Sequence, residues 1–363
     1  MVLSILLLTN WRNLLRLRGK GDKWTIVIGF QIIMIAYGLL SPTDNMTTQL
    51  LSFHLYIIAL CYAYISNKDD SFIDYIPEVV FYTSSIATIL GVYFSAIGFV
   101  SGETAYIMRN EYDDFYIEAF TVSTGALINL FSAICMEKRN KIENIIVLIA
   151  IILDVYILFN STKRTPIFIA IAGILVFWYK QGGIGIKGIK IIILKFIPLL
   201  ILFLIAYKYL PAFHNMVDDI FTRLYTGIRI LLGAEGSEFI EDSAQVRVDL
   251  KKIAYTYINN HFTFINYIFG AGYLLEWLDI PILESFVDMG IIGLFFYSYI
   301  VIFIPFRCYL KKHLSSVAIF SILVSLYPIF SAFNSGHPYM YQKYTGVCFV
   351  IFIFYQMRHK SIT

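Results

Sequence analysis

Charged side chains are scarce in this sequence. Asp, Glu, Lys and Arg make up 15% of the 363 residues, while hydrophobic residues make up 58%. A soluble domain carries roughly 25% charged residues. Because so little polar material cannot coat a water-soluble globule, we expect lipid to be the solvent of this chain. The basic residues are not gathered on one soluble face, so we expect no nucleic-acid partner.

Cysteines are few, and their spacing is uninformative. Cys61, Cys135, Cys308 and Cys348 each lie within or at the end of an apolar run. The sequence contains no CxxC motif and no Cys/His spacing of the kind that binds zinc. It therefore predicts neither a disulfide framework nor a metal site.

Long apolar runs are the dominant feature of the chain. Most are long enough to cross a bilayer, which takes about 17–25 residues. They cover residues 24–40, 49–66, 77–100, 117–136, 142–160, 166–180, 189–209, 286–306, 315–333 and 344–357. We therefore predict an all-α fold, a polytopic membrane helix bundle of about ten transmembrane helices that forms one integral membrane domain over residues 1–363.

The distribution of Lys and Arg predicts the orientation. With ten spans, most basic residues in short connections fall on one side, which the positive-inside rule assigns to the cytoplasm. These residues are Arg12, Arg16, Arg18, Lys20, Lys23, Lys68, Lys138, Arg139, Lys141, Lys180, Lys187, Lys190, Arg307, Lys311, Lys312, Arg358 and Lys360. The opposite short loops hold only Arg109, Lys163, Arg164 and Lys343. We expect both termini in the cytoplasm and a large outer loop over residues 210–285.

The outer loop carries two amphipathic patterns, at residues 217–232 and 246–257. Apolar residues recur in both at helical spacing. In the second pattern they are Val246, Leu250, Ile253 and Tyr257. We expect both helices to lie at the membrane surface. Asp242 and Gln245 have the spacing of a helix N-cap with its reciprocal partner, and residues 269–273 predict a tight turn.

Four arginines are candidates for binding a phosphate or diphosphate, because a guanidinium donates paired hydrogen bonds to phosphate oxygens. Arg164 stands on the side where positive charge is disfavoured, Arg247 lies on the second loop helix, and Arg223 and Arg229 lie on the first. Each has an ordinary alternative. Arg164 can snorkel at the surface together with Lys163, and interfacial helices carry Arg to meet lipid phosphates.

Three residues are candidates for a general base. Asp279 and Glu284 come just before the eighth span, and His337 lies in the last outer loop. The alternative for the two acids is a helix N-terminal carboxylate stabilised by the helix dipole, and for the histidine an ordinary turn residue. Tyr273 and Trp277 can stack on sugar faces or serve as interfacial aromatics.

Three further ionisable residues, His54, Asp154 and Asp288, fall within or near spans. Ionisable groups inside the membrane are candidates for function. Each of these lies near the outer end of its span, so solvation is the alternative.

The order of motifs before the eighth span resembles a known family. Arg247, the turn Gly270-Ala271-Gly272-Tyr273, the polar segment Asp279–Glu284 and the sequence Gly290-Ile291-Ile292-Gly293-Leu294 follow one another. This arrangement resembles the large periplasmic loop of the bacterial O-antigen polymerase and ligase group, the Wzy-like proteins. The segment Ser161-Thr162-Lys163-Arg164-Thr165 is similar to an Arg that this group carries at the outer end of a middle span. With the topology, the resemblance extends over nearly the whole chain.

The resemblance implies an enzyme of the bacterial inner membrane. It would be an O-antigen polymerase, a glycosyltransferase of lipopolysaccharide biosynthesis that joins undecaprenyl-diphosphate-linked oligosaccharide repeat units on the periplasmic side. Its partners would be that lipid-linked substrate, membrane lipids and, as a candidate, a chain-length regulator protein. No metal or nucleotide cofactor is expected. Arg164 and Arg247 would bind the diphosphate, and Asp279, Glu284 or His337 would supply the base.

Two other functions stay open at this point. An O-antigen ligase belongs to the same group, but ligases usually place a His followed by a polar residue where this sequence has Asp279-Ile280. A lipid-linked oligosaccharide flippase belongs to a different class, and it should show internal repeats and charges that line a central cavity. Neither is evident here, and the long outer loop favours an enzyme.

Overall fold

The computed structural model describes most of the predicted spans and the second half of the outer loop. The described ranges are 22–41, 45–66, 72–100, 119–136, 140–161, 164–180, single positions between 204 and 225, 242–275, 278–311, 314–334 and 336–360. Within these ranges the chain is helical and contains no strand. The all-α fold class is therefore confirmed.

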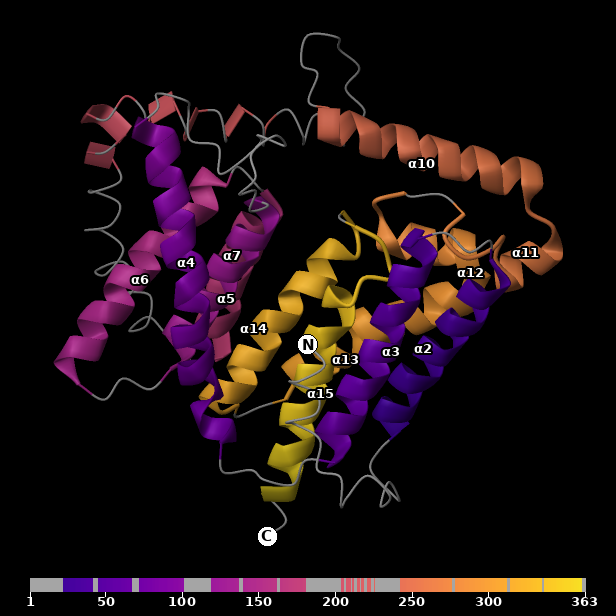
Figure 1. Cartoon of the computed structure of the whole chain (residues 1–363), viewed down its shortest axis with the longest axis horizontal. Coiled ribbons are helices and arrows are strands. Elements are labelled where there is room, and N and C mark those ends of the chain that lie inside the picture. Colours follow the sequence, from indigo (N-terminus) through magenta and orange to yellow (C-terminus); the bar gives the residue numbers. More distant parts are fainter. Residues whose placement is uncertain are drawn as a thin grey trace. The chain divides into compact units, whose positions relative to one another are not determined.

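The helices follow the apolar runs closely (Figure 1). Their bounds are α2 Asp22–Leu40, α3 Asn45–Ser66, η1 Ile73–Tyr75, α4 Ile76–Val100, α5 Ala119–Cys135, α6 Lys141–Asn160, α7 Arg164–Lys180, α10 Asp242–His261, α11 Phe264–Phe269, α12 Pro281–Ser298, η2 Tyr299–Phe303, α13 Ile304–Tyr309, α14 Ser316–Ser331 and α15 Gln342–Lys360. Nine of the ten predicted spans coincide with these helices. The run 189–209 lies almost wholly outside the described residues.

Several helices can cross a membrane by length and composition. Five segments of the described chain meet both criteria: Lys23–Leu40, Thr47–Ile65, Ile73–Tyr93, Lys141–Phe159 and Pro281–Tyr309. Shorter apolar helices cover Thr121–Cys135, Thr165–Lys180, Ser316–Ser331 and Gln342–Phe354. Large apolar side chains project outward from these helices, for example Ile145, Ile149 and Ile152 on α6. Such exposure is unfavourable in water and favourable in lipid, as expected of a multi-pass membrane protein.

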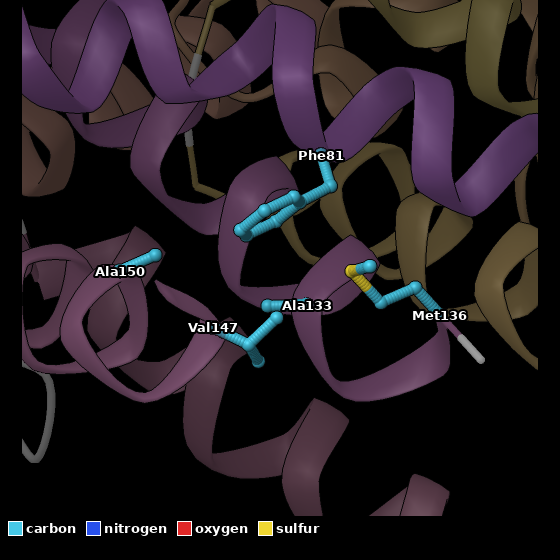
Figure 2. Packing of buried hydrophobic residues seen from close by; sticks show 5 residues of the cluster. All are labelled: Phe81, Ala133, Met136, Val147 and Ala150. Carbon is cyan, nitrogen blue, oxygen red and sulfur yellow. The ribbon is translucent and has the colours of Figure 1, made fainter. Parts of the chain in front are cut away.

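The chain divides into two compact units. Unit 1 contains Met1–Ile73, Asp242–Lys312 and Val324–Thr363, and unit 2 contains Asp74–Glu241 and His313–Leu323. Unit 2 is built on α4, α5, α6 and α7. Its core includes Phe81 on α4, Ala133 on α5, and Val147 and Ala150 on α6, with Met136 just beyond the end of α5 (Figure 2). The two alanines let the helix backbones approach closely around the phenylalanine ring.

Unit 1 packs α2 and α3 against α15. Tyr64 of α3 stacks on Phe352 of α15 with ring centroids 4.7 Å apart. The Sγ atoms of Cys61 and Cys348 lie 3.6 Å apart in the same contact. Aromatic stacking and close sulfur contacts of this kind provide the dispersion attraction that holds helices together in lipid, where the hydrophobic effect cannot.

Helix α10 confirms that the second loop pattern forms a helix. Val246 and Ile253 are exposed, and the position of this helix at the membrane surface stays a prediction. Leu250 and Tyr257 of the predicted apolar face pack, together with Ala254 and Ile258, against Leu278 and Val287. Those partners belong to α12 and the segment before it, so tertiary contacts rather than the apolar periodicity alone select the buried face. In Figure 1, α10 runs at a steep angle to α2 and α3. The first pattern, 217–232, lies mostly outside the described residues.

Candidate functional site

Helix α12 is interrupted at Gly290, where the backbone takes φ 64° and ψ −156°. In an unbroken helix, the carbonyls of Val287 and Asp288 would accept hydrogen bonds from residues four positions later. Here they accept hydrogen bonds from the N–H groups of Ala271 at 2.8 Å and Gly272 at 3.1 Å. Irregular backbone at membrane depth is tolerated when protein groups satisfy it in this way. The break therefore docks the loop before α12 onto the middle of that helix.

Two glycines make this docking sterically possible. Gly270 has φ +79°, and a Cβ there would lie 2.1 Å from the carbonyl oxygen of Asp288. A Cβ on Gly290 would lie 2.4 Å from the carbonyl oxygen of Ile268. Both positions bring backbone against backbone, and both require a positive φ that L side chains rarely adopt. The predicted tight turn at 269–273 is confirmed, and its partner is the broken helix.

Asp288 is buried at the break and is bound by three donors. The hydroxyl of Tyr339 donates to its Oδ2 at 2.5 Å, and the N–H of Leu274 donates to the same oxygen at 3.0 Å. The N–H of Leu275 donates to Oδ1 at 3.3 Å. Asp288 is 0% exposed, so the solvation suggested for it by its place near a span end is wrong. Its three hydrogen bonds instead hold the loop and Tyr339 together.

Glu284 lies one helical turn before Asp288 and is also fully buried. Its Oε2 accepts a hydrogen bond from the N–H of Leu278 at 3.1 Å. Its Oε1 lies 4.0 Å from Nδ1 of His337 and has no hydrogen-bond partner among the residues that the structure describes. A buried carboxylate oxygen without a donor is costly. Among the described residues, this oxygen is therefore an acceptor position that is open to another group.

His337 comes from the loop between α14 and α15 and is 1% exposed. Burial, together with the positive charge of Lys343, lowers the pKa of the His337 imidazole from 6.5 to about 4. The ring is therefore neutral at pH 7 and presents one donor and one acceptor. The interpretation of His337 as an ordinary exposed turn residue is wrong, because the ring is buried beside a carboxylate.

His54 is a second buried histidine, and it contacts Tyr273. The Nδ1 of His54 is 2.8 Å from Oε1 of Gln31, so this nitrogen donates to the amide oxygen. Its Nε2 then accepts from the hydroxyl of Tyr273 at 3.0 Å. Burial and the nearby charges of Asp288 and Glu284 raise the pKa of the Tyr273 hydroxyl, which keeps its proton. His54 is 0% exposed, so solvation does not account for it either.

We call the buried polar residues Asp288, Glu284, His337 and His54, with the residues bound to them, the cluster. The aromatic candidate Tyr273 is packed inside this cluster. Its ring centroid lies 4.1 Å from that of Tyr339, and the side chain is 5% exposed. A sugar can reach the ring only when the loop moves, so stacking stays a prediction. The other aromatic candidate, Trp277, lies outside the described residues.

Arg247 and Asp279 form an ion pair at the edge of the cluster. The Nε of Arg247 lies 3.2 Å from Oδ2 of Asp279, and the two side chains are 34% and 31% exposed. The N–H of Gly336 donates to Oδ1 of Asp279 at 2.5 Å. Asp279 itself has φ 52°, and Leu274 has φ 53°. Each such non-glycine backbone costs on the order of 1–3 kcal/mol and persists only where other contacts enforce it. Asp279 thus ties α10 to the loop that carries His337.

Lys343 is a buried cation beside these acids. Its Nζ donates to the carbonyl of Ser331 at 3.4 Å, and the side chain is 2% exposed. Asp279 and Glu284 are the two acids whose negative charges act on it. Burying a lysine is expensive unless carboxylates compensate it. The cluster therefore balances its buried acids with one internal cation and one cation at its edge.

The structure brings several of the predicted site residues together. Arg247, Asp279, Glu284, His337 and Tyr273 all lie in unit 1 around the loop, the break and the 336–341 segment. Arg164 is the first residue of α7 and belongs to unit 2, so a diphosphate site shared with Arg247 stays a prediction. Arg223 and Arg229 lie outside the described residues.

Five residues of the cluster were not among the predicted catalytic and binding residues: Gln31, His54, Asp288, Tyr339 and Lys343. The sequence carried a signal for three of them. His54 and Asp288 are ionisable residues within or near spans, and Lys343 is a basic residue on the side where positive charge is disfavoured. Nothing in the sequence pattern distinguishes Gln31 or Tyr339 from other polar and aromatic residues of the spans.

The cluster contains the parts of an acid–base site with a cationic edge. Among the described residues, His, Cys, Asp and Glu nowhere form a group of three that could hold a metal ion. No protein-family model and no curated protein matches the chain. The functional argument therefore rests on the residues and their geometry.

Proposed function

We propose that this protein is a membrane glycosyltransferase that joins lipid-linked oligosaccharide repeat units, in the manner of an O-antigen polymerase. The observation that carries the proposal is the convergence of Arg247, Asp279, Glu284 and His337 from three distant segments of the sequence. Transfer from a lipid diphosphate needs a cation for the departing charge and a base for the attacking hydroxyl. A half-exposed guanidinium near a buried carboxylate and imidazole supplies both.

The proposed reaction balances without a cofactor. A hydroxyl at the sugar end of one lipid-linked unit attacks the anomeric carbon of a second unit. A new glycosidic C–O bond forms, and the bond from that carbon to the diphosphate oxygen breaks. Its electron pair leaves with undecaprenyl diphosphate. The hydroxyl proton passes to the base.

Glu284 is the base that the hydrogen bonds favour. Its Oε1 has no donor among the described residues. The oxygens of Asp279 are bound by Arg247 and Gly336, which makes Asp279 a positioning residue. His337, neutral at pH 7, lies close enough to orient the Glu284 carboxylate after a small rotation. A general base must reach the hydroxyl within hydrogen-bond distance, and Glu284 has the acceptor to do so.

Arg247 is the proposed diphosphate ligand. Its Nε is paired with Asp279, and the side chain is 34% exposed. Two oxygens of a diphosphate can accept from the remaining N–H donors of the guanidinium in bidentate geometry. Arg164, Arg223 and Arg229 stay predicted ligands of phosphate groups.

Access to Glu284 requires motion. Glu284 and His337 are 0% and 1% exposed, so the closed cluster excludes water as well as substrate. Opening of the loop before α12, or of the segment after α14, would admit the sugar. Sites that must keep water from a reactive donor commonly use such a closure.

The reaction would take place on the periplasmic side of the inner membrane. The ten-span topology, with residues 210–285 outside and both termini in the cytoplasm, puts the loops that build the cluster on that side. The basic residues of the short connections support this orientation.

The experiment is turnover by the purified protein in liposomes with a lipid-linked repeat unit as the sole substrate. We expect oligomers of the repeat unit and release of undecaprenyl diphosphate. Glu284→Gln should abolish both. Arg247→Ala should slow both about ten- to hundredfold, since a charge-assisted contact contributes roughly 1.5–3 kcal/mol. Arg247→Lys should recover little, because it lacks the paired geometry.

Control substitutions on α10, the helix that carries Arg247, separate effects on chemistry from effects on folding. Lys251→Ala and Lys252→Ala change exposed or half-exposed cations of α10 and should keep wild-type rates, as should Asp249→Asn. Wild-type oligomer formation by Glu284→Gln would refute its role as the base. Product formed only when a lipid A core acceptor is added would make the protein a ligase. Movement of the intact substrate across the bilayer without any new glycosidic bond would make it a flippase.

A further inference from the structure

A buried polar cluster in unit 2 lies outside the proposed catalytic site. It joins three apolar helices: Thr88, Ser84 and Ser85 come from α4, Asn129 from α5 and Asp154 from α6. Thr88, Asn129 and Asp154 are at most 2% exposed. The alternative of solvation for Asp154 near its span end is therefore wrong. A carboxyl group at this depth needs partners of its own.

Close packing of small residues brings these side chains together. A Cβ on Gly91 of α4 would lie 2.6 Å from Val122 of α5 and 2.9 Å from Ile157 of α6. A Cβ on Gly125 of α5 would lie 2.7 Å from that of Ala87 on α4. Small residues at such crossings let membrane helices approach closely. The polar groups are thus enclosed, and the neighbouring contacts are apolar.

In the described part of the chain, no cation balances Asp154. Among the described residues its polar partners are Thr88 and Asn129 alone. The other titratable residues on the packed elements are Glu78, Tyr82 and Tyr93 on α4, Cys135 on α5, Lys141, Glu143 and Tyr156 on α6, and Arg164, Tyr179 and Lys180 on α7. Arg164 aside, whose side chain lies outside the described part of the chain, none of them acts on the carboxyl group. Within the described residues, an ionised Asp154 would therefore be a buried charge without a counter-ion.

The serine hydroxyls show which way the Asn129 amide must face. Each hydroxyl has one proton, and each already makes a short contact with a carbonyl of its own helix: Ser84 with Val80 at 2.6 Å and Ser85 with Phe81 at 2.7 Å. Oxygens this close need a proton between them. The Asn129 atom that lies 2.9 Å from Ser84 and 3.4 Å from Ser85 is placed as the acceptor Oδ1. With the serine protons already committed, this atom must instead be the amide nitrogen, which donates.

This orientation puts the Asn129 oxygen against the carboxyl group of Asp154. The two ends of an amide are distinguished by the hydrogen bonds they make. The end that faces Asp154 lies 3.2 Å from Oδ1 and 3.1 Å from Oδ2. The one proton of Thr88 is committed to Oδ1, at 2.5 Å. Between the amide oxygen and Oδ2 a proton is still missing, and only Asp154 can carry it.

The geometry points to a proton-binding site at Asp154. The neutral acid donates from Oδ2 to Asn129 and accepts from Thr88 at Oδ1, while the Asn129 nitrogen donates to Ser84 and Ser85. Every polar atom of the cluster is then satisfied. A metal cation fits less well, because the oxygens are in direct contact with one another at 2.5–3.2 Å and leave no space between them. Release of the proton would set two acceptors against each other, and the Asn129 amide would have to turn its nitrogen toward the carboxylate.

Infrared spectroscopy of the protein in liposomes tests this site, since a protonated carboxyl group absorbs apart from carboxylates. At neutral pH, the wild-type spectrum minus that of Asp154→Asn should contain one carboxylic acid carbonyl band. Asn keeps both hydrogen bonds, so the variant should fold, and its thermal unfolding should match the wild type. Glu143→Gln, on the same helix, should leave the band in place. A spectrum of Asp154→Asn identical to the wild type in this region would overturn the proposal.

Two further measurements examine the partners and the ligand. Asn129→Leu removes the acceptor and should shift the band to higher frequency, so an unshifted band would refute the pairing with Asn129. Transfer into D2O should shift the band, and failure to do so would refute an exchangeable proton. Replacing choline chloride by sodium chloride at equal concentration should change nothing. Loss of the band in sodium would overturn the assignment to a proton in favour of sodium.

Discussion

Three carboxylates of unit 1 differ in what holds them, and this difference suggests their roles. Asp288 accepts from a tyrosine and two backbone N–H groups, and Asp279 accepts from Arg247 and Gly336. Both are fully engaged in fixing the loops. Glu284 alone keeps an oxygen without a donor among the described residues. A charged group in a low-dielectric interior is energetically costly when it lacks a hydrogen-bond partner. Groups of this kind are common at catalytic sites.

The buried state of His337 predicts a pH dependence of stability. An unfolded histidine binds a proton below pH 6.5, whereas burial and Lys343 lower the folded pKa to about 4. As the pH falls from 6.5 to about 4, the unfolded state therefore binds a proton at this ring and the folded state does not. The free energy of unfolding decreases over that pH range. The loss should reach about 3 kcal/mol and should be absent above pH 6.5. Thermal unfolding in detergent, measured from pH 7.5 to 4.5, would show it.

His337→Gln isolates this contribution. The variant lacks the titrating ring, so its unfolding temperature should fall less steeply than that of the wild type below pH 6.5. His214→Gln changes a histidine whose side chain is 45% exposed and serves as the control for loss of a histidine. Parallel pH profiles for the wild type and His337→Gln would show that His337 is not kept neutral by the fold.

The interruption of α12 is the element-scale feature that builds the cluster. It frees two carbonyls for the preceding loop and thereby positions Leu274 and Leu275 to bind Asp288. Broken helices whose ends are satisfied by protein groups are typical of binding sites in membrane proteins. The break therefore links the local backbone of one residue to the arrangement of the whole site.

Alanine at Gly290 should undo this arrangement. The new Cβ would meet the Ile268 carbonyl at 2.4 Å in a backbone with φ +64°. Strain of this kind costs on the order of 1–3 kcal/mol before the clash is counted. We expect a lower unfolding temperature and faster proteolysis of the loop at residues 270–280. Gly29→Ala is the matched control, since a Cβ there has nothing within 4 Å in a regular helix. Equal unfolding temperatures for the two variants would contradict a structural role for the break.

The positions of helices could be predicted from the sequence where the bilayer sets their length. They were harder to predict where tertiary contacts determine the ends and breaks of a helix. The apolar runs located the helices because the bilayer sets their length. The start of α12 at Pro281 and the break at Gly290 escaped the pattern, since 286–306 reads as one continuous span. Hydrogen bonds from Ala271 and Gly272 stabilise that break, and no local signal in α12 reveals distant donors. On α10 as well, distant contacts matter: its buried face is the one that contacts Leu278 and Val287, and Val246 is exposed.

At the scale of the molecule, the candidate site was predictable by residue type and less so by arrangement. Ionisable groups stand out in an apolar chain, which is why Asp279, Glu284 and His337 could be selected from the sequence. Their division into one base candidate and two positioning residues depends on bonds to Gly336, Leu278 and Arg247. Such bonds join residues up to 57 positions apart, and a single sequence carries no record of them.

The orientation of the whole chain is a prediction that labelling can decide. The basic connections place residues 210–285 outside and the termini in the cytoplasm. The four native cysteines are buried, so a membrane-impermeant thiol reagent should report on an added cysteine. Ser237→Cys should react in intact cells once the outer membrane is passed, whereas Arg139→Cys should react only after the inner membrane is permeabilised. The reverse pattern would invert the topology and place the Glu284 cluster on the cytoplasmic side, where a periplasmic polymerase could not work.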